Sequence, residues 1–246
     1  MGVAALPEER PARTKVTFVL ADEILTLRLP ASCEDALWAT LADAGRQLTG
    51  AVRLVVVRGA GADFFDGTAA LRSAVPVRRS IGSEAAVSTA EALGWFRRPD
   101  LVTVAAISGR ATGAGLDVAM ACDLRIVTED AQLAASDMNE DPERGLGLGI
   151  DTVTRLGDAL GYSRALEFVT TTRGVSGRQA AALGLANLAV DPTELDAALG
   201  QLIDGVLAMP RSTVATAKAV LAAADVDRRR RTDELADGLR LAAGEI

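Results

Sequence analysis

The stretch LVTVAAISGRATGAGLDVAMACD, residues 101–123, starts as an apolar run and ends in a segment of helical character, with Gly113 and Gly115 between the two. An apolar run of this kind predicts a strand that is buried on both faces of a sheet. The first N–H groups of a helix have no partner inside the helix, so a helix that starts at a glycine turn presents free donors there. We therefore expect a strand, a glycine turn and a helix whose first amides are available to a ligand.

An upstream stretch, VRLVVVRGAGADFFDGTAAL at residues 52–71, repeats this arrangement, with glycine turns at residues 59–61 and 67–68. A dinucleotide fingerprint requires a third glycine where Phe64 stands, and no acidic residue ends a following strand, so we reject that interpretation. Two parallel strands that each end in a glycine turn can aim one N–H apiece at a common point, which is an oxyanion hole. The alternative explanation is that the glycines of these turns serve only close packing of the backbone.

The surrounding sequence predicts an α/β protein with a mainly parallel sheet. KVTFVL and EILTLRLP predict a hairpin, residues 33–48 and 83–98 predict helices, the second capped by Ser83, and short strands are expected around LRIVT and AQLAA. We expect a loop at residues 75–82. From Asp151 onward the sequence predicts almost only helix, at 151–160, 162–170, 176–183, 193–208, 211–224 and 228–243.

The composition narrows the function classes. The net charge of −7 over 246 residues disfavours nucleic acid as a partner, and the absence of histidine excludes Ser-His-Asp catalysis and histidine-ligated metal sites. Cys33 and Cys122 are expected to be reduced core residues. The chain shows neither a secretory signal nor a membrane-spanning run, so we expect a cytoplasmic location. An anion-binding patch, or merely solvated side chains, would account equally well for six arginines: Arg58, Arg72, Arg78, Arg79, Arg97 and Arg98.

Three segments resemble the enoyl-CoA hydratase/isomerase (crotonase) superfamily: VRLVVVRGAGADFFDGTAAL, VAAISGRATGAGLDVAMACDLRI and TRGVSGRQAAALGLANLAV. The resemblance implies a crotonase-like α/β spiral of β-β-α units at residues 15–190. It also implies a C-terminal helical region at 191–246 that packs against neighbours in a homotrimer or a dimer of trimers. The prolines and mixed charge of residues 1–14 predict a loose arm.

The resemblance also implies a site. The backbone amides of Thr68 and Ala114 would hold the thioester oxygen, with Gly67, Ala69, Gly113 and Gly115 beside the substrate. Hydratases of the superfamily carry two glutamates at positions that Asp117 and Asp137 occupy here. Asp117 would then activate the water, and Asp137 would exchange the proton at the α-carbon.

Further acids and a base complete the expected site. Glu140, Asp141 and Glu143 offer substitute carboxylates, and Lys218 would meet a phosphate of coenzyme A.

The function that this resemblance implies is hydration of an α,β-unsaturated acyl-CoA by a lyase of fatty acid metabolism. No metal and no cofactor other than the coenzyme A of the substrate is expected. Two alternatives stay open: isomerisation or other enolate chemistry on an unusual acyl thioester, and binding of acyl-CoA without turnover.

Overall fold

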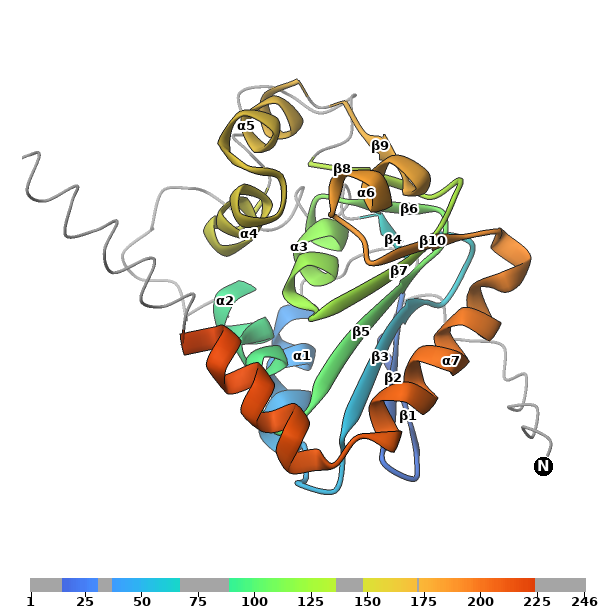
Figure 1. Ribbon diagram of the computed structural model, residues 1–246, viewed down its shortest axis with the longest axis vertical. Coiled ribbons are helices and arrows are strands. Elements are labelled where there is room, and N and C mark those ends of the chain that lie inside the picture. The colour runs from blue at the N-terminus through green and yellow to red at the C-terminus, as the bar shows by residue number, and fades with distance from the viewer. Residues whose placement is uncertain (1–14, 31–36, 67–88, 136–147, 172, 224–246) are drawn as a thin grey trace, which may run out of the picture.

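The computed structural model describes residues 15–30, 37–66, 89–135, 148–171 and 173–223. Its main sheet has six strands in the order β1-β2-β3-β5-β7-β10, all parallel to their neighbours except the hairpin pair β1 and β2 (Figure 1). The strands of this sheet are β1 (Thr17–Ala21), β2 (Ile24–Leu29), β3 (Leu54–Gly59), β5 (Val102–Ile107), β7 (Leu124–Thr128) and β10 (Leu188–Val190).

A second, smaller sheet has the order β4-β6-β8-β9. Its strands are β4 (Phe65–Asp66), β6 (Arg110–Thr112), β8 (Gln132–Ala134) and β9 (Val175–Ser176). Along the chain, a strand of the main sheet is followed by a strand of the small sheet and then by a helix, as in β5, β6 and α3 (Ala114–Ala121). This repeated unit is the spiral of β-β-α turns that the sequence predicted.

The remaining helices surround the two sheets. They are α1 (Leu37–Gln47), α2 (Thr89–Leu93), η2 (Gly94–Arg97), α4 (Ile150–Leu160), α5 (Tyr162–Thr170), α6 (Gly177–Leu183), η4 (Pro192–Glu194) and α7 (Leu195–Ala208). Residues 211–223 form a further helix. No helix in the described ranges is long and apolar enough to cross a membrane.

The apolar strands are explained by burial on both faces. In β3, Val55 and Val57 belong to the large core that also holds α1 and α3, whereas Leu54 and Val56 pack with Leu195 of α7 on the opposite face (Figure 1). Side chains alternate between the two faces of a strand, so a strand covered on both sides has no polar face to show.

Most predicted elements are confirmed, including the hairpin, the buried strands and the helices α1, α3, α4, α5 and α7. The prediction of almost only helix after Asp151 is wrong, because β9 and β10 lie in that region and β10 extends the main sheet. These strands are only two and three residues long, too short for a periodic signal. The arm at 1–14, the loop at 75–82, Ser83, Cys33 and the helix at 228–243 fall outside the described residues.

Candidate active site

Helix α3 forms the buried centre of the site. All eight of its residues are buried, and the N-cap residue before it is Gly113, whose φ of 52° and ψ of −116° are accessible to glycine but strained for other residues. The amides of Ala114 and its successors in the first turn have no carbonyl partner within the helix. The backbone at the second glycine turn is thus shaped to present N–H donors.

The start of α3 is pressed against β4. A Cβ atom at Gly115 would stand 2.1 Å from the carbonyl oxygen of Phe65, so only glycine allows this approach. Strands β4 and β6 are parallel with Asp66 opposite Thr112, and both therefore end at the same edge of the small sheet. The first glycine turn, with Gly67, Thr68 and Ala69, follows Asp66 in the sequence but lies outside the described residues. The Thr68 amide stays a prediction.

Asp117 is the acidic group of α3, and its side chain turns inward. It is only 5% exposed, and its Oδ1 accepts a hydrogen bond of 3.0 Å from the Gly149 N–H and its carboxylate another from Thr152. Burial raises the pKa of Asp117 from 3.8 to about 6, and these two hydrogen bonds oppose the rise. A carboxylate with a pKa near neutrality can take up and return protons at working pH.

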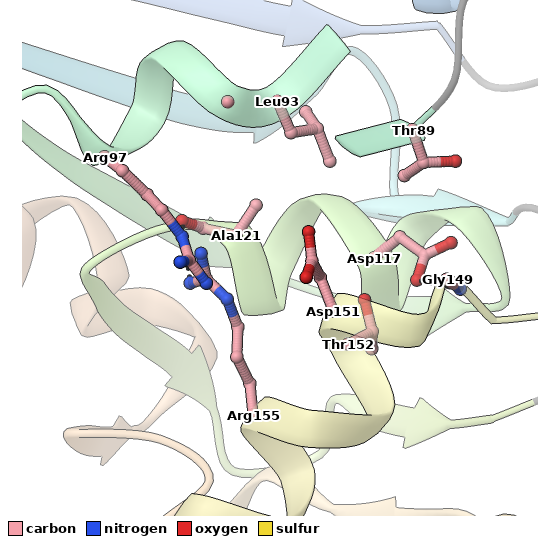
Figure 2. Close-up of a pocket in the computed structure, with 10 residues that line it drawn as sticks. Thr89, Leu93, Arg97, Asp117, Ala121, Gly149, Asp151, Thr152 and Arg155 are labelled. Atoms are coloured by element: carbon pink, nitrogen blue, oxygen red, sulfur yellow. Dashed lines mark hydrogen bonds between the residues drawn. The ribbon is translucent and has the colours of Figure 1, made fainter. Parts of the chain in front are cut away.

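Asp117 faces a pocket of about 550 Å³ between three elements (Figure 2). Helix α2 with η2 forms one wall, α3 another, and the start of α4 a third. The lining residues are Thr89, Leu93, Gly94, Arg97, Asp117, Ala121, Gly149, Asp151, Thr152 and Arg155. The pocket is large enough for a small acyl group beside a buried carboxylate.

Lys218 is bound by three oxygen atoms of the protein itself. Its Nζ donates to the carbonyl oxygens of Phe96 at 2.8 Å and Leu101 at 2.9 Å and to Oδ2 of Asp123 at 2.7 Å. An ammonium group has three donors, and all three are used. This geometry argues against the expected contact with coenzyme A and assigns Lys218 to the attachment of helix 211–223 to the sheet.

The other predicted acids, Asp137, Glu140, Asp141 and Glu143, lie outside the described residues. Cys122 is buried and free, as expected, and burial raises its thiol pKa, which makes it a poor nucleophile. Among the described residues, no group of three or more His, Cys, Asp or Glu side chains is placed to hold a metal ion.

Sequence reasoning missed three residues of the pocket wall formed by α4. Gly149 and Thr152 hold the Asp117 carboxylate, and Arg155 lines the far end. The sequence showed only a helix here. The three-residue spacing of Thr152 and Arg155, which places both on one helix face, was the available signal.

Comparison with known proteins identifies relatives. Residues 29–239 match the model of the enoyl-CoA hydratase/isomerase family. The glyoxysomal fatty acid beta-oxidation multifunctional protein MFP-a of Cucumis sativus is 39% identical over 154 residues, which are 58% of this chain and 20% of that protein. The peroxisomal Delta(3,5)-Delta(2,4)-dienoyl-CoA isomerase of Arabidopsis thaliana is 31% identical over 182 residues, or 74% of this chain and 62% of that enzyme. In both cases the matched part is less than two thirds of the relative's own length.

Solved structures show a likeness to enoyl-CoA hydratases over nearly the whole chain. A Thermobifida fusca YX protein described as an enoyl-CoA hydratase, in complex with acetoacetyl-CoA, superposes with a TM-score of 0.70 at 29% identity. The match covers 95% of this chain and 97% of that one. The same protein in complex with CoA gives a TM-score of 0.69.

Proposed function

Because the chain belongs to the enoyl-CoA hydratase/isomerase family, we propose that it binds an acyl-CoA thioester, stabilises its enolate and adds water to an α,β-unsaturated acyl group. The bound CoA and acetoacetyl-CoA of the Thermobifida fusca relative support a CoA thioester as the ligand. In this proposal the Ala114 and Thr68 amides donate to the thioester oxygen, where negative charge develops.

Water addition then needs one base and one acid. Asp117 takes a proton from a water molecule while the oxygen of that water bonds to the β-carbon. Asp137 then delivers a proton to the α-carbon as the enolate collapses. The product carries the hydroxyl at the β-carbon and the hydrogen at the α-carbon, and a proton passing from Asp117 to Asp137 through solvent restores the starting state.

The observation that carries this proposal is the position of Asp117. Its carboxylate lies on the same helix as the Ala114 amide, three residues further along, faces the pocket and has a pKa of about 6. A buried carboxylate costs stability, and the fold retains it beside a cavity of ligand size, which is typical of an active-site base.

Hydration, isomerisation and binding without turnover predict different products. We propose to incubate the protein with crotonyl-CoA in heavy water and to follow loss of the conjugated enoyl thioester together with deuterium at the α-carbon. Hydration gives a deuterated β-hydroxyacyl product. A shifted double bond without added water would favour isomerisation, the reaction named for the Arabidopsis relative. Binding with neither product would overturn catalysis.

The matched variants are Asp117→Asn and Asp204→Asn. The first removes the proposed base, and we expect a rate loss of about 10²- to 10⁴-fold. The second removes an exposed carboxylate on α7 and leaves the rate unchanged. The homotrimer or dimer of trimers stays a prediction, which sedimentation analysis of the purified protein tests.

A further inference from the structure

The pocket has two chemically different ends. Figure 2 shows Asp117 with Thr89 and Gly149 at one end and Arg97 with Arg155 at the other. Leu93 lies between these ends on α2, and Ala121 lies one turn beyond Asp117 on α3. A ligand that fills the pocket from the Asp117 end therefore passes Leu93, Ala121 and the carboxylate of Asp151 before it reaches the two guanidinium groups.

Arg155 is fixed at this far end by the last turn of α3. Its Nη1 donates to the carbonyl oxygens of Met120 at 2.6 Å and Ala121 at 3.2 Å, the last turn of α3. A guanidinium carries five N–H donors, and the two hydrogen bonds to α3 both come from Nη1. Paired N–H donors of a guanidinium match the two oxygens of a carboxylate.

The two arginines repel each other. Burial and then the charge of Arg97 are the largest causes that lower the pKa of Arg155 to about 10, and the opposing effect of Asp151 is smaller than that of Arg97. Asp151 lines the same pocket, and its charge acts against this repulsion. An anion bound between the guanidiniums would relieve the repulsion that the empty pocket retains.

The length of α3 sets the size of the ligand. Ala114, the proposed thioester contact, and Ala121, beside Arg155, are seven residues apart, or about 10 Å along the helix axis. A short chain of several carbons spans this distance. The phosphates of coenzyme A lie at the other end of a long pantetheine arm that leaves from the thioester sulfur, so they are not the natural occupants.

We propose that Arg97 and Arg155 bind a carboxylate at the far end of the acyl chain, and that the substrates are CoA thioesters of short dicarboxylic acids. This inference rests on the proposed function, because it takes the Ala114 end of the pocket as the thioester site.

The test compares three thioesters of equal chain length: 2-hexenoyl-CoA, its analogue with a free terminal carboxylate, and the methyl ester of that analogue. We expect kcat/KM for the carboxylate substrate to exceed that for the other two by about ten- to a hundredfold, as for a charge-assisted hydrogen bond. Binding of the saturated analogues by calorimetry gives the same comparison without turnover.

Arg97→Gln is the main variant because Arg97 is exposed and its loss leaves the core intact. It should remove most of the carboxylate preference, measured as the ratio of kcat/KM for the carboxylate substrate to kcat/KM for 2-hexenoyl-CoA in the same variant. Arg164→Gln, an exposed change on α5, is the charge-matched control. Arg155→Lys retains a donor to the α3 carbonyls while losing the paired donors, and it should also weaken the preference.

The outcomes separate this inference from the proposed function. Turnover of 2-hexenoyl-CoA with no preference for the carboxylate overturns the inference alone. A preference that survives Arg97→Gln also overturns it, and weaker binding of CoA itself in that variant would assign the arginines to a phosphate. Tight binding of the dicarboxylic thioester without turnover supports the inference and overturns catalysis. Failure to bind any thioester overturns both.

Discussion

Replacing Asp117 by asparagine tests whether the buried charge of Asp117 lowers the free energy of unfolding. Asparagine has the same shape and can still accept from the Gly149 N–H and from Thr152, but it stays neutral. The folded pKa of about 6 lies above the ordinary 3.8, so the native state binds the proton more tightly than the unfolded chain. At about 1.4 kcal/mol per pKa unit, the rise corresponds to about 3 kcal/mol.

The sign of the pH dependence follows from this rise. The wild type has the full stability of its protonated Asp117 below pH 3.8 and loses it as pH rises through about 6. Roughly 1.4 kcal/mol of the loss falls between pH 5 and 7.5. The free energy of unfolding of Asp117→Asn relative to the wild type should therefore rise by that amount over this range.

Urea denaturation followed by tryptophan fluorescence at pH 5, 6 and 7.5 measures this difference, with Asp204→Asn as the exposed control. The variant should thus be the more stable and the less active protein at neutral pH. If the difference between Asp117→Asn and the wild type is the same at all three pH values, the carboxylate is not held in the low-dielectric site described here.

Three further predictions concern the frame of the site. Gly115→Ala should lower the free energy of unfolding by about 3 kcal/mol, because its Cβ would stand 2.1 Å from the Phe65 oxygen. Gly157→Ala, in open space on α4, is the control and should raise it by up to about 1 kcal/mol. Equal effects of the two changes in urea denaturation would contradict the close approach. Lys218→Met should cost about 2–3 kcal/mol in thermal unfolding, since three oxygens lose their donor, and an unchanged melting temperature would reject the attachment role. Asp117→Glu should slow hydration about a hundredfold, because its carboxylate moves by about 1.5 Å, and faster turnover would refute this.

The sequence predicted those elements whose pattern is local. Strands such as β3 and β5 show as apolar runs because both faces are covered, and α3 shows because glycines precede it. The two- and three-residue strands β9 and β10 carry no such pattern. Their place depends on pairing with β8 and β7, strands that lie far from them in the sequence.

The sequence predicted single residues of the site but not the contacts that those residues make. The family resemblance singled out Asp117 after the second glycine turn, but its pKa is raised by burial and held down by hydrogen bonds from Gly149 and Thr152, which the sequence does not show. Lys218 was assigned to a phosphate on the family resemblance of the C-terminal helices, and its three protein partners come from distant segments. The pairing of Arg97 with Arg155 across the pocket likewise required the fold.

The resemblance drawn from the sequence implies a glutamate at the position of Asp117, and the position of α4 explains how the shorter aspartate is held. Helix α3 is buried throughout and pressed against β4 at Gly115, so it cannot advance to compensate for a shorter side chain. The compensation comes from the opposite wall, where the Gly149 N–H and Thr152 reach the carboxylate. The same helix face carries Arg155 one turn further on. Any change that moves α4 should therefore alter both the proton affinity of Asp117 and the charge at the far end of the pocket.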